Sequence, residues 1–194
     1  MELLLSVCIG LGLSAACGFR IFVPLLITSI AAHSGHLNLA PSFEWIGSPA
    51  ALAAFSVATA LEVGGYYIPW LDNFLDTVAT PASIVAGTIV TASMVTDVSP
   101  FLKWSLAVVA GGGIAGTVQA TTVLARGLSL TGTGGMANPI IATAELGGSI
   151  LTALAAVIAP FFAMALIVLL LGIAGYKLIR RRSETKVPPV IGVA

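Results

Sequence analysis

Arg20 is the residue of this chain that most clearly predicts chemistry. It lies in an apolar stretch from Leu3 to Ala32 that contains no other charge. A guanidinium at the centre of a membrane helix costs at least ~2.5 kcal/mol on insertion scales, so it usually faces a partner, a cavity or a substrate. Gly18 and Pro24 flank Arg20, and both residue types interrupt helices. We therefore expect a broken membrane helix with Arg20 at the break, where it binds an anionic group.

Two glutamates in apolar segments supply acid–base chemistry. Two short segments of the chain resemble each other, and we call this similarity the echo: Ala58-Thr-Ala-Leu-Glu-Val-Gly-Gly65 and Ala142-Thr-Ala-Glu-Leu-Gly-Gly148. Glu62 and Glu145 occupy matching places in the two segments. Carboxylates inside a membrane often form proton relays, so either one is a candidate for carrying a proton during transport. The alternative is that one of them only neutralises Arg20.

A pair of aspartates is the candidate metal site. Asp72 and Asp76 are four residues apart, so on a helix they share one face, with the Asn73 amide nearby. Such oxygen ligands suit Mg²⁺. The alternative is electrostatic, because aspartates near the start of a helix offset its dipole. We expect no other cofactor.

A glycine-rich turn from Thr131 to Pro139 leads into an apolar segment. Asn138 fits as the N-cap of a helix that starts at Pro139, and free backbone amides at a helix start attract anions. We therefore add Asn138 to the predicted binding residues, with a plain capped loop as the alternative. The Gly-Lys-Ser/Thr ending of a nucleotide-binding P-loop is missing.

The composition determines the class of protein that must position these residues. Mean hydropathy is +1.06, and only 8% of residues are charged, against ~25% in soluble domains. We predict an all-α integral membrane protein with one transmembrane domain over residues 1–182 and about five or six membrane helices. Cys8 and Cys17 lie in one membrane segment and are expected to be packing residues that form no disulfide.

Hydropathy divides the chain into apolar segments separated mostly by short loops. The first is too long for one span, since some thirty helical residues cover ~45 Å against a hydrocarbon core of ~30 Å. It either tilts and kinks, or folds back at Gly18 to Arg20 as a re-entrant hairpin. Pro160 likewise marks a tight hairpin or a kink. The expected segments are Leu3 to Ser34, Ser48 to Tyr67, Trp70 to Ala79, Pro81 to Val95, Lys103 to Ala125, Ala137 to Ala159 and Pro160 to Ile179.

Basic residues predict the orientation. They cluster after the last apolar segment, which places the C-terminus in the cytoplasm by the positive-inside rule. On six crossings, the loop from His33 to Gly47 lies outside and Arg126 lies at the cytoplasmic boundary. Residues 183–194 are expected to be a disordered tail. The cluster consists of Lys177, Arg180, Arg181, Arg182 and Lys186.

The echo predicts an internal repeat. Gly10-Leu-Gly12 precedes the first copy and Gly111-Gly-Gly113 precedes the second, which suggests two halves of three segments each. Halves with an odd number of spans have opposite orientations, and transporters with such inverted repeats bind substrate near the midplane. The alternative is chance similarity in a chain rich in Ala, Gly and Thr.

Three motifs resemble a known family. They are Gly-Phe-Arg-Ile-Phe-Val-Pro-Leu at 18–25, Tyr-Ile-Pro-Trp-Leu-Asp-Asn-Phe-Leu-Asp-Thr at 67–77, preceded by Glu62, and Thr-Gly-Gly-Met-Ala-Asn-Pro at 133–139. Together they resemble a bacterial family of small multi-spanning membrane proteins catalogued as a domain of unknown function. The resemblance implies a multi-pass protein of the bacterial inner membrane and a shared fold, without an activity. The Gly-x-Arg-x-Phe-x-Pro core is also similar to the re-entrant arginine motif of DedA-type lipid translocases.

These observations lead to one functional hypothesis and two alternatives. We expect a small transporter or lipid translocase, not an enzyme, that binds an anionic lipid or small-molecule anion at Arg20 and exchanges a proton at Glu62 or Glu145. We expect the protein to lie in the lipid bilayer and to bind no nucleic acid. A homo-oligomer is compatible with the sequence. The alternatives are a non-catalytic assembly subunit, in which the charges hold helices together, and a Mg²⁺-dependent enzyme acting on a lipid diphosphate through Asp72 and Asp76.

Overall fold

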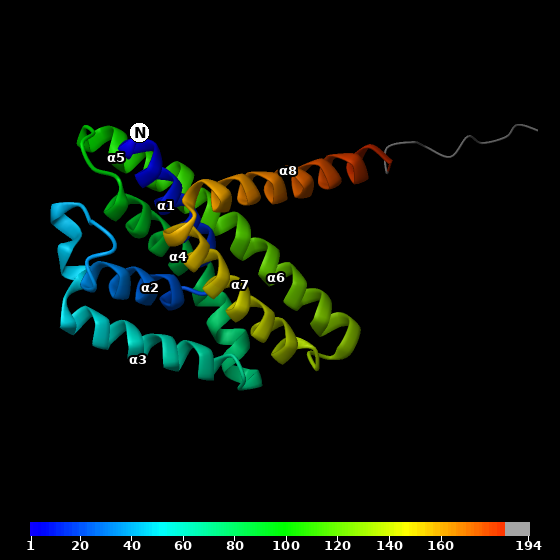
Figure 1. Ribbon diagram of the computed structural model, residues 1–194. Coiled ribbons are helices and arrows are strands. Elements are labelled where there is room, and N and C mark those ends of the chain that lie inside the picture. Colours follow the sequence, from blue (N-terminus) through cyan, green and yellow to red (C-terminus); the bar gives the residue numbers. More distant parts are fainter. Residues whose placement is uncertain (185–194) are drawn as a thin grey trace, which may run out of the picture.

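The computed structural model describes residues 1–184, without the side chains of residues 69, 70, 72, 73, 171, 174, 175 and 177–184. Every regular element among the described residues is a helix, as predicted (Figure 1). Cys8 and Cys17 are both free and buried. The fold is therefore a bundle of apolar helices, and the close packing of these helices brings the charged residues together.

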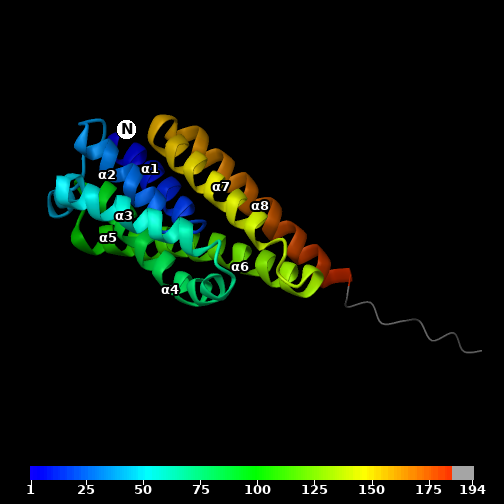
Figure 2. The ribbon, with the colours of Figure 1, turned by 90° about the horizontal axis from the view of Figure 1, so that it is seen from below.

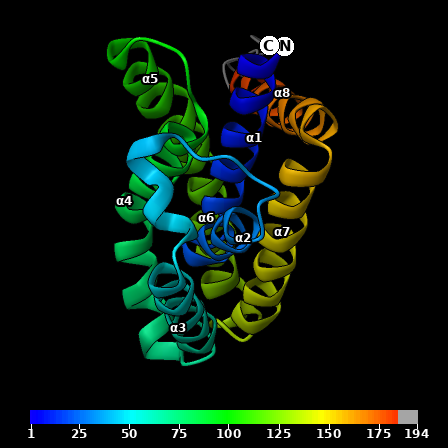
Figure 3. The same ribbon diagram turned by 60° about the vertical axis from the view of Figure 1, so that its left-hand side comes forward.

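The first apolar segment is broken at the predicted position. Helix α1 (Glu2–Cys17) ends before Gly18, and α2 (Phe22–His33) begins after Ile21. A Cβ on Gly18 would lie 2.6 Å from the Ala115 carbonyl oxygen, so only glycine lets the break approach this neighbouring helix. Helix α2 leaves the break in a new direction and crosses the bundle (Figure 3).

A second bent element follows. The 3₁₀-helix η1 (Pro41–Gly47) and helix α3 (Pro49–Gly65) meet at an angle of 62°. The Ser48 hydroxyl caps α3 by accepting from the Ala51 N–H. Helix α3 packs against α2, and Figure 3 shows this pair running across α1, α4 and α7. The crossing pair carries Glu62 toward the break between α1 and α2.

Helix α4 (Pro69–Met94) corrects one prediction. The sequence suggested two pieces separated near Pro81, but the helix continues through this proline. An internal proline removes one backbone hydrogen bond and usually kinks a helix without ending it when apolar helix formers follow. The uninterrupted helix carries Asp76 toward the interior of the bundle.

The long apolar stretch from Pro100 to Thr133 is continuous. It comprises α5 (Pro100–Leu106), a π-helical turn η2 (Ala107–Gly112) and α6 (Gly113–Thr133). At η2 the chain meets α1 and α4 through small residues: the Ser14 hydroxyl donates to the Gly111 carbonyl, and the Thr91 hydroxyl donates to the Gly10 carbonyl at 3.2 Å. We refer to this contact of α1, α4 and η2 as the small-residue seam.

Helices α7 (Asn138–Ile158) and α8 (Pro160–Glu184) meet at Ala159, which has non-helical backbone angles. Figure 1 shows α8 turning sharply away from the end of α7, so Pro160 marks a turn between two helices. In Figure 2, α7 and α8 lie on one side of the molecule, and α4 and α5 lie on the other. The predicted disordered tail begins at residue 183, but residues 183 and 184 belong to α8, and residues 185–194 lie outside the described part of the chain.

Three described helices are long and apolar enough to cross a membrane, or four if the bent η1–α3 pair is one span. They are Phe74–Met94, Pro100–Thr133 and Asn138–Ile158. Shorter apolar helices cover Glu2–Cys17, Phe22–His33 and Pro160–Leu170. The chain is thus a helical membrane protein, and the expected five or six crossings are matched loosely, because several apolar segments are short or bent.

Candidate functional site

Arg20 lies at the break between α1 and α2 with a side chain that is only 1% exposed. Its Nη2 donates to the Ala142 carbonyl oxygen at 2.9 Å and lies 3.5 Å from Oε2 of Glu145. Its Nε and Nη1 have no hydrogen-bond partner among the described residues. A buried guanidinium with unused donors is costly, so these two nitrogens could donate to an added acceptor.

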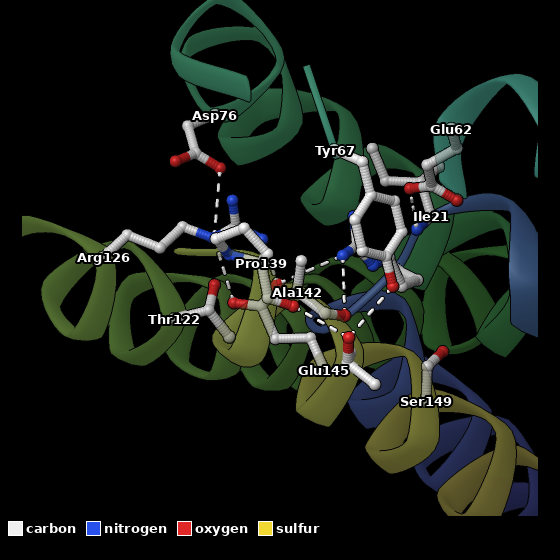
Figure 4. A network of polar contacts seen from close by, with 12 residues as sticks. Ile21, Glu62, Tyr67, Asp76, Thr122, Arg126, Pro139, Ala142, Glu145 and Ser149 are labelled. Atoms are coloured by element: carbon white, nitrogen blue, oxygen red, sulfur yellow. Dashed lines mark hydrogen bonds and ion pairs between the residues drawn. The ribbon is translucent and has the colours of Figure 1, made fainter. Parts of the chain in front are cut away.

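Arg126 is the second buried cation. Its Nε donates to Oε1 of Glu145 at 3.1 Å, and its Nη2 pairs with the other oxygen of the same carboxylate. Oδ1 of Asp76 lies 3.6 Å from the Arg126 Nε. Figure 4 shows Arg126 and Glu145 facing each other from neighbouring helices, with Asp76 approaching from α4. The two-pronged geometry makes this a strong ion pair.

Tyr66 connects the two arginines. Its ring centroid lies 3.6 Å from the guanidinium carbon of Arg20 and 4.4 Å from that of Arg126. Tyr66 follows α3 directly and is buried. Cations over a desolvated aromatic face gain up to ~2 kcal/mol, so the ring offsets part of the cost of burying two positive charges.

Glu62 serves the backbone at the break. Its Oε1 accepts from the Ile21 N–H at 2.7 Å, and its Oε2 accepts from the Phe22 N–H at 3.0 Å. No side chain at Ile21 caps α2, so a carboxylate from α3 satisfies the free amides and complements the positive end of the helix dipole. Glu62 therefore holds the break in shape.

The structure brings three of the predicted binding residues to one place: Arg20, Glu62 and Glu145. Glu145, and not Glu62, is the carboxylate that pairs with the arginines. The Tyr67 hydroxyl forms a hydrogen bond of 2.9 Å with the Thr143 hydroxyl on α7, which links the end of α3 to α7 next to these residues. The cluster of the buried residues Arg20, Tyr66, Arg126 and Glu145 with the partly buried Asp76 is called the charge cluster below.

The N-cap prediction for Asn138 is wrong. Asn138 is the first residue of α7, and the capping position is Ala137. The amide of Ala137 donates to the Thr133 hydroxyl instead. The preceding turn has the predicted glycine chemistry, since Gly134 and Gly135 have φ values of +63° and +85°. Asn138 lies one helical turn before Ala142.

The proposed metal pair is only partly described. Asp76 lies beside Arg126, while the side chain of Asp72 lies outside the described residues. Within the part of the chain that the structure describes, no group of three or more His, Cys, Asp or Glu residues could hold a metal ion. Magnesium binding by Asp72 and Asp76 stays a prediction.

Arg126 and Tyr66 are the residues that sequence reasoning missed. Arg126 was interpreted as a charge at the membrane boundary, yet it is buried. A signal was present: Gln119, Thr122, Arg126 and Ser129 follow a helical period, and all four are buried. A polar stripe on an apolar helix points into the bundle. Tyr66 carries no comparable pattern.

No curated protein and no solved structure matches the chain. A family model matches residues 7–180, which include every residue of the charge cluster. The family's description assigns no activity, so function has to be argued from the site itself. The chain belongs to the family described as Domain of unknown function (DUF4126).

Proposed function

We propose that this protein is a small membrane transporter that binds an anionic group at Arg20 and couples its movement to a proton on Glu145. One observation carries the proposal: Arg20 is buried in a helix break, and two of its guanidinium nitrogens, Nε and Nη1, donate to no described residue. A carboxylate or phosphate oxygen matches these donors in charge and geometry. Intramembrane arginines usually mark a substrate path.

The net charge of the charge cluster supports proton coupling. With all groups ionised, Arg20 and Arg126 balance Asp76 and Glu145, so the four residues are neutral. An incoming anion would leave an uncompensated negative charge, which is expensive at low dielectric. Protonation of Glu145 removes that charge. It also weakens the hold of Glu145 on both arginines, which frees Arg20 for the anion.

The broken helix supports a mid-membrane site. Irregular backbone at membrane depth persists where it is buried in protein or lines a cavity, and transporters use such breaks to bind ions and substrates. Here Glu62 caps the start of α2, and Gly18 allows close contact with α6. Arg20 is therefore held on a fixed backbone.

The convergence of the two echo glutamates supports the inverted repeat. Glu62 from α3 contacts the amides of Ile21 and Phe22, and Glu145 from α7 contacts Arg20. Matching residues of two halves meeting at one break is the arrangement expected of a repeat interface. We include a 3+3 repeat, the bacterial inner membrane and a cytoplasmic C-terminus in the proposal.

Native mass spectrometry of protein extracted gently from its own membranes tests anion binding. Wild type is compared with Arg20→Gln and Arg20→Lys, and Lys103→Gln is the control for loss of a remote cation. We expect an anionic adduct on wild type and on the control, with occupancy lower by about tenfold in Arg20→Gln. An anionic adduct other than a bound phospholipid that persists in Arg20→Gln, or the absence of any such adduct in every form, contradicts the proposal.

Transport itself is tested in proteoliposomes that contain a pH-sensitive dye. Inorganic phosphate, sulfate and acetate serve as probes, each imposed as a gradient. We expect at least one gradient to drive proton movement in wild type, and this movement to disappear in Glu145→Gln. Anion movement that continues without protons in Glu145→Gln would remove the coupling and leave the anion site.

The pairing of Arg126 with Glu145 in the charge cluster favours a second candidate function, that of a non-catalytic assembly subunit. Arg126 and Glu145 pair through two contacts, which is also how membrane helices are held together in non-catalytic subunits. An assembly subunit predicts a protein partner in mild-detergent pulldowns that Arg20→Gln retains, together with no anion effect in either assay above.

A further inference from the structure

We propose that a groove between α1, α6, α7 and α8 is a binding site for one acyl chain of an anionic phospholipid. The groove encloses about 460 Å³, which is within the ~300–1,000 Å³ typical of small-molecule sites. It is separate from the charge cluster and independent of the transport proposal.

The groove walls are apolar. The lining includes Phe19 at the helix break, Val118 on α6, Leu151 on α7 and Leu166 on α8. Thr121 and Thr152 are the polar residues of the lining, and the Thr121 hydroxyl donates to the Thr117 carbonyl of its own helix at 3.0 Å. A ligand in this groove therefore meets mainly hydrocarbon, which favours an apolar occupant over a polar metabolite.

The groove has a closed floor and an open side. Ala15 and Ala163 are 2% and 3% exposed, and these small residues line the bottom of the groove. Leu151 and Phe162 at the edge are 70% and 68% exposed. In a helix bundle at membrane depth, the medium facing such an edge is lipid hydrocarbon. Figure 1 shows how α8 diverges from α6 and α7 after the turn at Ala159.

Charge along the sequence points to the headgroup. The groove-lining part of α8 ends at Leu170, and the sequence continues to four basic residues between Lys177 and Arg182. Basic residues next to a membrane helix attract anionic lipids, by ~1 kcal/mol each near the surface. An acyl chain along α8 would bring its phosphate toward this basic segment, so the favoured occupant is anionic.

Groove-filling variants test the site by native mass spectrometry with phosphatidylglycerol and phosphatidylcholine of identical chains. Ala155→Phe fills the groove from α7, and Thr121→Trp fills it from α6. Ala165→Phe is the matched control, because Ala165 is exposed on α8 and does not line the groove. We expect wild type and control to retain phosphatidylglycerol, and both fillers to lose it by about tenfold. Unchanged retention in the fillers overturns the proposal, and equal retention of both lipids overturns the anionic headgroup.

A reporter pair answers the same question without filling the groove. Phe162 lines it, while the neighbouring Phe161 is exposed outside it. In vesicles, Phe162→Trp is expected to be quenched by phosphatidylglycerol with brominated acyl chains at a mole fraction about threefold lower than Phe161→Trp. Quenching at the same mole fraction in both variants means bulk lipid contact only and overturns the proposal.

Discussion

The two arginines of the charge cluster differ in how completely their guanidinium groups are paired. At one end, Arg126 is held by both oxygens of Glu145 and approached by Asp76. At the other end, Arg20 has one carbonyl acceptor and a carboxylate at 3.5 Å that also pairs with Arg126. Its nitrogens Nε and Nη1 have no hydrogen-bond partner among the described residues. The same residue type is thus paired through two contacts at one end and incompletely paired at the other.

This difference separates stability from binding. A saturated buried ion pair is costly to break, because removing one partner leaves an uncompensated charge. An incompletely paired arginine gains little in the empty protein and more when an acceptor arrives. Substitutions at the two ends should therefore act on different observables, and the following experiments use this contrast.

The largest effect is expected from Arg126→Met. It leaves Glu145 and Asp76 without their main cation, so the free energy of unfolding should fall by about 3–5 kcal/mol. Detergent-titrated unfolding followed by tryptophan fluorescence measures this loss. The double variant Arg126→Met with Glu145→Leu should recover much of it. A loss below about 1 kcal/mol would mean that the Arg126–Glu145 ion pair contributes little to stability.

A smaller effect is expected from Glu62→Ala, which removes the acceptor for two amides at the start of α2. Helix caps are worth about 0.5–2 kcal/mol, and we expect a loss near the upper end. Glu62→Gln keeps an acceptor oxygen and should lose clearly less in the same unfolding assay. Equal losses in both variants would indicate that the charge of Glu62 serves the arginines and not the backbone.

Tyr66→Leu should cost about 1 kcal/mol, because it removes the aromatic ring that contacts both guanidinium groups. Tyr66→Phe retains that face and is the matched control, with a smaller expected loss. If Phe destabilises as much as Leu, the hydroxyl matters and the ring does not.

The smallest effect on stability is expected from Arg20→Met. Replacing an incompletely paired buried charge by an apolar side chain of similar length is often neutral or stabilising, so unfolding should change by less than about 1 kcal/mol. Anion binding should nevertheless disappear from the native mass spectrum. A destabilisation as large as that of Arg126→Met would make the two ends equivalent and remove the contrast.

The sequence predicted the parts of this site that depend on local pattern. Gly18 and Arg20 in an apolar stretch led directly to the helix break, and the echo singled out Glu62 and Glu145. Pairing between distant residues could not be predicted in the same way, since it depends on how helices cross. The choice of Glu145 over Glu62 as the partner of Arg20 is decided by the crossing of α3 beneath α2, which turns Glu62 to the amides at the break.

Arg126 was missed for another reason. A single charge near the end of an apolar segment is typical of a membrane boundary, and only the stripe with Gln119, Thr122 and Ser129 shows that it faces inward. Pro81 was misread because a proline within an apolar segment suits a break as well as a continuous helix, and tertiary packing makes the choice.

The small-residue seam has a mechanical consequence. Gly87, Gly111 and Thr91 bring the backbones of α4 and η2 so close that a Cβ on Gly111 would lie 2.9 Å from the Gly87 carbonyl oxygen. Surfaces interlocked at that range do not slide past one another. Helices α1 and α4 and the turn η2 therefore behave as one rigid unit, and any side chain larger than glycine at position 111 would have to force these backbones apart.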